Sequence, residues 1–104
     1  MAMKRPKTMK DYRLLVEETL FDVDDLRAAA EFDEDDMGGS LGFLDPIERD
    51  LRQLLKAMTE GGYRFGGQDL PSMDIVKRLD LATLPFKIQF TQINETHTHG
   101  LEEG

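Results

Sequence analysis

The fold is decided by residues 45–62, DPIERDLRQLLKAMTEGG, which have every feature of one amphipathic helix. Asp45 and Pro46 form a start signal, because Asp caps free backbone N–H groups and Pro suits the first helical position. Gly61 and Gly62 end the pattern, since glycine tolerates the left-handed backbone that stops a helix. Between these signals, apolar side chains recur on one helical face at Ile47, Leu51, Leu54, Leu55 and Met58. This segment therefore predicts a helix that covers a core with one face.

Two helices are expected upstream of this segment. Thr8, with Asp11 three residues later, indicates a loose capping box at the start of residues 9–21. Asp22 can cap a second helix over residues 23–36, and two glycines follow as a stop signal. The apolar faces of these helices are formed by Tyr12, Leu15, Val16, Thr19 and Leu20 in the first and by Val23, Leu26 and Ala30 in the second.

Two shorter helices are expected downstream. Ser72 opens SMDIVKRLDL, which turns Met73, Val76 and Leu79 inward, and a last helix after Pro85 carries Phe86, Phe90, Ile93 and His97 on one face. Residues 84–90 also alternate as a strand does, but a lone strand has nothing to pair with, so we favour the helix. The sequence thus predicts an all-α fold, a compact bundle of four or five short helices. We expect one domain, 1–104, with 1–8 and 98–104 frayed.

Charge is the strongest compositional signal. The formal net charge is −8, and between Glu17 and Asp36 ten acidic residues face a single base, Arg27. Such a field repels the phosphates of nucleic acids and anionic lipids, and it attracts basic protein surfaces. We expect these carboxylates to gather along one water-facing flank. The end of this run, Asp33, Glu34, Asp35 and Asp36, crowds the negative end of a helix dipole, where cations are favoured.

Two sequence patterns near this run resemble known functional sites, but each lacks a feature that its chemistry requires. Residues 38–42, GGSLG, match the G-x-S-x-G pattern of serine hydrolases, but that pattern requires a buried strand before it, and DEDDM precedes it here. Residues 34–45 have the length of a calcium-binding loop with Gly39 at its glycine position, yet Asp45 replaces the bidentate Glu that should end it. We therefore predict no catalytic residues and no strong metal site, and keep weak divalent-cation binding at residues 33–45 as an alternative.

Other metal or redox chemistry has little support. The chain contains no cysteine, which excludes disulfides and thiolate ligands. His97 and His99 lie two apart, so on one helix they point away from each other and cannot share a metal ion. His97 is expected to end the core face or the helix. No cofactor is predicted.

Residues 63–65 are the most distinctive loop. Tyr63, Arg64 and Phe65 stand between two glycine pairs, and aromatic residues and arginine dominate protein-binding hot spots. The alternative is that Tyr63 and Phe65 fold back over the core while Arg64 pairs with the acidic helix. We predict partner-binding residues here and at Asp33, Glu34, Asp35 and Asp36.

Three segments carry a resemblance to known proteins. LFDVDDLRAAAEFDEDDMGG (20–39), YRFGGQDLP (63–71) and INETHTHG (93–100) resemble short bacterial proteins that are labelled as belonging to the general secretion pathway. The resemblance implies a soluble accessory factor of that pathway. It attaches no chemistry to any of these residues.

Together these features predict a small acidic, non-enzymatic interaction or accessory module that binds a protein partner with a basic surface. An acidic mimic of nucleic acid is a further alternative, and self-association into a homodimer through an apolar helix face stays open. No run approaches the roughly 20 apolar residues of a membrane span, and no secretory signal follows the basic start, so we expect a cytoplasmic protein.

Overall fold

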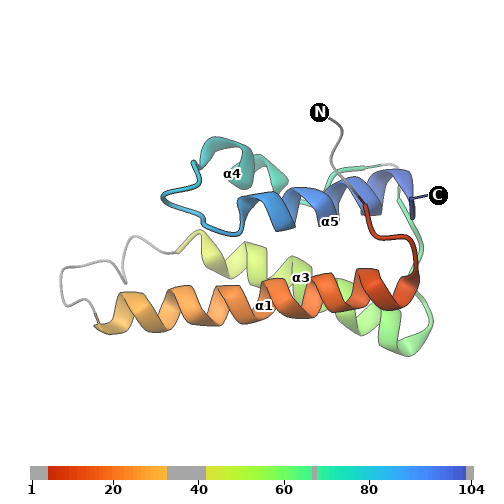
Figure 1. Ribbon diagram of the computed structural model, residues 1–104, viewed down its shortest axis with the longest axis horizontal. Coiled ribbons are helices and arrows are strands. Elements are labelled where there is room, and N and C mark those ends of the chain that lie inside the picture. Colours follow the sequence, from red (N-terminus) through yellow and green to blue (C-terminus); the bar gives the residue numbers. More distant parts are fainter. Residues whose placement is uncertain (1–4, 33–41, 67, 103–104) are drawn as a thin grey trace.

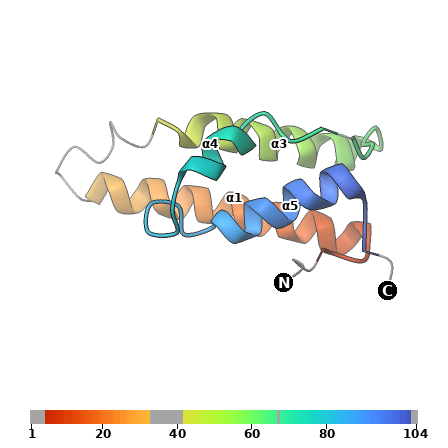
Figure 2. The same cartoon turned by 90° about the horizontal axis from the view of Figure 1, so that it is seen from above.

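The computed structural model describes residues 5–32, 42–66 and 68–102, and these residues contain four helices: α1 (Met9–Phe32), α3 (Leu44–Glu60), α4 (Met73–Arg78) and α5 (Lys87–His99). Figure 1 shows α1 and α3 running antiparallel in one layer, with α4 and α5 in a second layer. In Figure 2, α5 lies over α1 and α4 lies over α3. The predicted all-α bundle of four or five helices is confirmed, and no strand occurs in the described segments.

The core lies between the two layers. The predicted face of α3 points into it, with Ile47, Leu51 and Leu54 buried and Leu55 and Met58 packed against them. The last helix contributes Phe86, Phe90 and Ile93 as predicted, so the strand alternative for residues 84–90 is wrong. The remaining buried apolar side chains are Tyr12, Val16, Leu20, Val23, Leu44, Leu70, Met73, Val76 and Leu84.

One predicted boundary is wrong, because α1 continues through Asp22 instead of restarting there. The buried face of Val16, Thr19 and Leu20 extends at helical spacing to Val23, and no glycine or proline interrupts residues 9–32. Burial of that uninterrupted face favours a continuous helix over the local capping tendency of aspartate. The predicted part of this helix beyond residue 32 lies outside the described residues.

The predicted helix ends are partly correct. The Asp11 amide donates to Thr8 Oγ1 at 3.1 Å, which confirms the cap of α1, and Gly61 ends α3 with a left-handed backbone at φ 77°. Ser72 occupies the predicted N-cap position of α4, although its side chain forms no cap bond, whereas Asp45 lies inside α3, which already begins at Leu44. The Asp45 side chain accepts from Arg27, and the Ser72 hydroxyl donates to Asp50. Both predicted capping groups are therefore engaged in tertiary contacts.

Buried polar groups tie the loop of residues 61–72 to the helices. The Asp50 side chain is 4% exposed, and its Oδ2 accepts hydrogen bonds from the Ser72 amide at 2.8 Å and from Ser72 Oγ at 2.5 Å. Asn94, also 4% exposed, accepts from the Leu70 amide at 2.7 Å. These bonds fix the start of α4 against α3 and α5.

The two ends of the described chain meet. The Arg5 amide donates to Glu102 Oε2 at 2.9 Å, and the Glu102 amide donates to the Pro6 carbonyl at 2.9 Å. Figures 1 and 2 both place the start of α1 and the end of α5 at the same end of the bundle. Fraying of residues 1–8 and 98–104 stays a prediction.

Candidate protein-interaction surface

The loop of residues 63–65 begins where Gly61 ends α3. Phe65 stacks on Tyr12, with ring centroids 6.0 Å apart, and the Tyr63 ring meets both in edge-to-face contacts at 5.7 Å from Tyr12 and 5.2 Å from Phe65. Tyr63 is half-buried, while Phe65 keeps 41% of its surface exposed. The loop thus folds back over the end of the core.

Hydrogen bonds lock Tyr63 in this position. Its hydroxyl lies 2.8 Å from the Tyr12 hydroxyl and 2.8 Å from His97 Nδ1, and the Gly66 amide donates to the His97 carbonyl at 2.9 Å. Burial raises the pKa values of both tyrosines and lowers the pKa of His97. The negative charge of Asp50 acts in the opposite direction on the His97 pKa, and burial is the larger effect. Burial thus favours the uncharged forms of all three side chains in this hydrogen-bonded chain.

Gly66 permits this close approach. A Cβ at this position would lie 3.2 Å from His97 Nε2, which is tighter than ordinary contact. Arg64, the third residue of the predicted loop site, is exposed and forms no ion pair with another described residue. Of the loop residues, Tyr63 is therefore held inward, and Arg64 and part of Phe65 face the solvent.

The other predicted partner-binding residues, Asp33, Glu34, Asp35 and Asp36, lie outside the described residues, as does most of the candidate cation loop 33–45. Its last member, Asp45, is described and accepts from Arg27 at 2.7 Å. Among the described residues, no three His, Asp or Glu side chains gather closely enough to hold a metal ion. His99 pairs with Glu95 at 3.3 Å, so the two histidines enter separate contacts.

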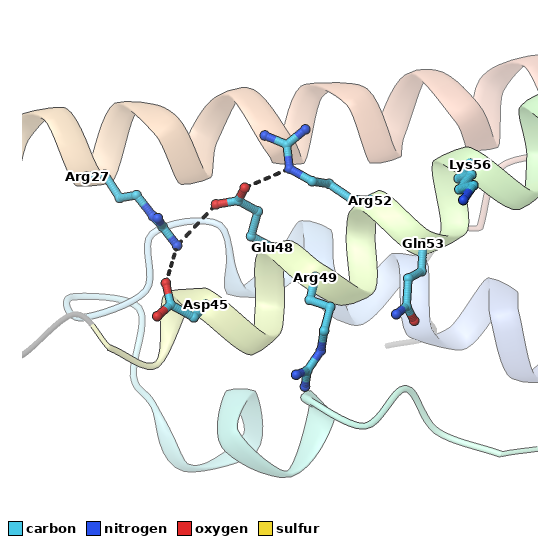
Figure 3. Close-up of a pocket in the computed structure, with 7 residues that line it drawn as sticks. All are labelled: Arg27, Asp45, Glu48, Arg49, Arg52, Gln53 and Lys56. Carbon is cyan, nitrogen blue, oxygen red and sulfur yellow. Dashed lines mark hydrogen bonds and ion pairs between the residues drawn. The ribbon is translucent and has the colours of Figure 1, made fainter.

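The flank of α1 that faces α3 carries neutralised charges. Arg27 binds both Asp45, at 2.7 Å, and Glu48, at 3.1 Å, and Glu48 also binds Arg52 at 2.6 Å (Figure 3). The hydrogen bond that Arg52 donates to Glu48, together with the negative charge of Glu48 and, more weakly, that of Asp24, raises the pKa of Arg52. On this flank, acidic side chains serve to join two helices.

The flank of α1 that faces α5 has the opposite character. Here a set of carboxylates lines two open hollows between α1 and α5, and we call it the acidic flank: Asp11, Glu18, Asp22 and Asp25. None of them forms an ion pair with another described residue. Partial burial and the charges of Asp25 and Glu18 raise the pKa of Asp22. The four carboxylates of the acidic flank thus form no ion pairs with other described residues, although Arg5 lines one of the two hollows.

The expected single acidic flank is therefore divided. Glu17 pairs with Arg13 of the same helix at 3.0 Å, and Asp24 acts on Arg52 of α3, so both carboxylates lie near an arginine. Glu18 and Asp25, each only one residue further along, belong to the α5 side. Sequence alone did not separate them, although a step of one residue rotates a side chain by about 100° around a helix.

Two further features were missed by the sequence reasoning. An apolar ridge runs along the outside of α1, where Leu14 is 43% exposed and Phe21 is 69% exposed. On α3, exposed Arg49 and Lys56 line an open hollow and form no ion pair with another described residue. The available signal was the spacing, because each pair lies seven residues apart and so shares a helical face.

No family model, curated protein or solved structure matches this chain. The resemblance to proteins labelled as belonging to the general secretion pathway stays a prediction. Within the described segments, no helix is both long and apolar enough to cross a lipid bilayer.

Proposed function

We propose that this protein is a non-enzymatic interaction module whose acidic flank binds a basic segment of a protein partner. One observation carries the proposal: Asp11, Glu18, Asp22 and Asp25 lie along one side of α1 and form no ion pair with another described residue, and Arg5 is the one cationic side chain that lines their hollows. Like charges held together in this way repel one another, and a bound cationic segment relieves that repulsion.

The shape of the flank favours an extended or helical segment as the ligand. The hollows contain apolar surface as well as carboxylates, with Leu14 and Leu15 in one and Leu26, Pro85 and Phe86 in the other. A basic amphipathic segment has the matching composition, since the stems of Lys and Arg cover apolar surface while their charged ends reach carboxylates.

The 63–65 loop belongs to this proposal as a second contact region. Arg64 and the exposed part of Phe65 lie near the N-terminal end of α1, where Phe65 stacks on Tyr12. Arginine and aromatic side chains contribute strongly when a partner buries them. Tyr63 acts by holding the loop, because its hydroxyl is already occupied by Tyr12 and His97.

The test uses a lysine-rich amphipathic helical peptide and the full chain, with binding measured by titration calorimetry at 0.05 M NaCl. Glu18→Gln with Asp25→Asn is the test variant, and Glu17→Gln with Asp24→Asn is its matched control. Both variants remove two α1 carboxylates that are seven residues apart, and the control also removes the exposed pair of Glu17 with Arg13. We expect the test variant to raise Kd about tenfold and the control less than threefold.

Salt gives a second readout. At 0.5 M NaCl we expect the peptide to lose most of its affinity for the unmodified protein, because exposed charges are screened over a few ångströms at high ionic strength. Equal losses in the two variants would contradict the proposal, since they would show only a response to net charge.

A further inference from the structure

An open hollow of about 430 Å³ lies between α3, the loop of residues 62–71 and the end of α5, and it shares no residue with the acidic flank. Its volume is in the range of small-molecule sites in proteins, whose walls are mostly apolar with a few polar groups. Two of its apolar lining residues, Leu54 and Leu70, belong to the packed core and are each 6% exposed. The apolar part of the wall is completed by Ala57 and Pro71.

Asp50 lines this hollow with a carboxylate that is only half satisfied. Its Oδ2 accepts both hydrogen bonds from Ser72, while its Oδ1 accepts none from another described residue. Oδ1 is not sealed in the interior, because the one fully enclosed side-chain nitrogen or oxygen without a partner in the described segments is Arg27 Nε. Since Asp50 is only 4% exposed and lines the hollow, Oδ1 is reached from the hollow.

Within the described part of the chain, no cation compensates this carboxylate. Asp50 takes part in none of the ion pairs. His97 lines the same hollow, but burial favours its uncharged form over the effect of the Asp50 charge. A buried carboxylate is stabilised by a cationic hydrogen-bond donor, because that donor replaces the lost solvation. Oδ1 therefore has the chemistry to bind an ammonium group that enters the hollow.

Arg64 supplies the opposite charge. It is exposed, lines the hollow and forms no ion pair with another described residue. Its loop is held in place by the Tyr63 hydroxyl, which binds Tyr12 and His97. A guanidinium group binds a carboxylate through two parallel hydrogen bonds. Because Asp50 and Arg64 do not pair with each other, a ligand that carries both charges can bridge them.

We propose that this hollow binds a free α-amino acid with an apolar side chain. The ammonium group binds Asp50 Oδ1, the carboxylate binds Arg64, and the side chain lies against Leu54, Leu70 and Pro71. A simple amine or a carboxylic acid would engage only one of the two charged residues. The proposal goes beyond the proposed function, because it concerns a separate surface and a different class of ligand.

The test measures binding of L-leucine to the full chain by amide chemical shifts in two-dimensional NMR. Two analogues each lack one charge: isopentylamine has no carboxylate, and isocaproate has no ammonium group. We expect L-leucine to shift the amides of Gly62, Arg64 and Leu70 with a Kd of about 1 mM or lower. Each analogue should bind about tenfold more weakly, because it leaves one charged residue without a partner.

Two variants separate the two contacts. In Asp50→Asn the side-chain oxygen still accepts from Ser72, but an amide NH₂ replaces Oδ1, so L-leucine should bind about tenfold more weakly and isocaproate as before. Arg64→Gln should weaken L-leucine about fivefold and leave isopentylamine unchanged. Arg78→Gln is the matched control, because Arg78 is exposed and does not line the hollow, and it should bind L-leucine like the unmodified protein.

Circular dichroism verifies that each variant is folded. If Asp50→Asn does not fold, the exposed Arg64→Gln and the two analogues still decide. An absence of shifts at about 20 mM L-leucine overturns the proposal. Equal binding of L-leucine and isopentylamine also overturns it, and so does an equal loss of L-leucine and isocaproate in Asp50→Asn.

The proposed function is tested separately in the variant Glu18→Gln with Asp25→Asn. We expect this variant to bind L-leucine like the unmodified protein, since neither residue lines the hollow. Its loss of the lysine-rich peptide then depends on the acidic flank alone. Weaker L-leucine binding in this variant would contradict the hollow between α3 and α5 as the amino-acid site.

Discussion

Asp50 and Asp22 show how differently one side chain behaves in two regions of this molecule. Asp50, at the contact of α3 with the start of α4, is almost fully buried and accepts two hydrogen bonds from Ser72. Asp22, on the acidic flank, lies between Glu18 and Asp25, and their charges together with partial burial raise its pKa. The first carboxylate holds the fold together, and the second, among like charges, costs stability when it ionises.

The comparison shows that the surroundings of a carboxylate, and not its place in an acidic run, decide its role. A buried carboxylate is retained when neutral donors satisfy it, and removing it leaves those donors without a partner. A partly exposed carboxylate among like charges contributes little to stability and can be changed freely. We make three predictions about stability, in order of decreasing expected effect.

Asp50→Ala is expected to lower the free energy of unfolding by about 2–3 kcal/mol, because the Ser72 amide and hydroxyl lose their acceptor in a buried site. Urea denaturation followed by circular dichroism measures the loss. Asp74→Ala is the control, since Asp74 is exposed in the first turn of α4 and should contribute only a few tenths of a kcal/mol through the helix dipole. Comparable losses in both variants would show that Asp50 has no special structural role.

His97 is expected to make stability depend on pH. Burial holds its pKa below the unfolded value of about 6.5, so the unfolded chain binds the proton more readily. The stabilisation is therefore complete above that value and decreases as the pH falls below it.

Urea midpoints between pH 8 and pH 5 measure this dependence. The decrease should become smaller in His97→Gln than in the unmodified protein. His99→Gln should keep the full decrease, because the exposed His99 ring takes no part in the Tyr63 hydrogen bond. A full decrease in His97→Gln would assign the dependence to other groups.

Asp22→Asn is expected to have the smallest effect, a gain in stability of up to about 0.5 kcal/mol at pH 7. A raised pKa means that the carboxyl favours folding only below its unfolded pKa of about 3.9, and this contribution is lost as the pH rises and the group ionises. Neutralising it at pH 7 therefore removes repulsion. Glu17→Gln, which breaks the exposed pair with Arg13, should instead lose a few tenths of a kcal/mol.

Thermal unfolding at 0.05 M and 0.5 M NaCl measures both changes. Screening should reduce the gain and the loss together. A loss of stability in Asp22→Asn at low salt would mean that the charges of the acidic flank are already neutralised.

The helical segments were predictable because their signals are local. The apolar spacing in residues 45–62 and the glycine at 61 specify a helix and its end without reference to the rest of the chain. Phe86, Phe90 and Ile93 likewise showed the face of α5. The break at Asp22 was predicted wrongly, since a local capping tendency was weighed without knowing that Val16 and Val23 bury against the same core.

The candidate site was less predictable for the same reason. Aromatic character singled out Tyr63 and Phe65, but only their contacts with Tyr12 and His97 assign the tyrosine to the fold. Phe21 was absent from the predicted site, because the seven-residue spacing that puts it on the same helical face as Leu14 was not used. Arg49 and Lys56 were absent because their charges stand out only once Arg27 and Arg52 are seen to be paired.

By itself, the sequence determined that this chain forms helices with one apolar face each, carries a large negative charge and lacks the residues of thiolate chemistry. The tertiary structure was needed to show that Arg27 of α1 binds Asp45 and Glu48 of α3, while Glu18 and Asp25 form no ion pair with another described residue. The physical reason is distance along the chain. Helical periodicity depends on neighbours within about four residues, whereas the neutralisation of a charge depends on side chains that approach from another helix.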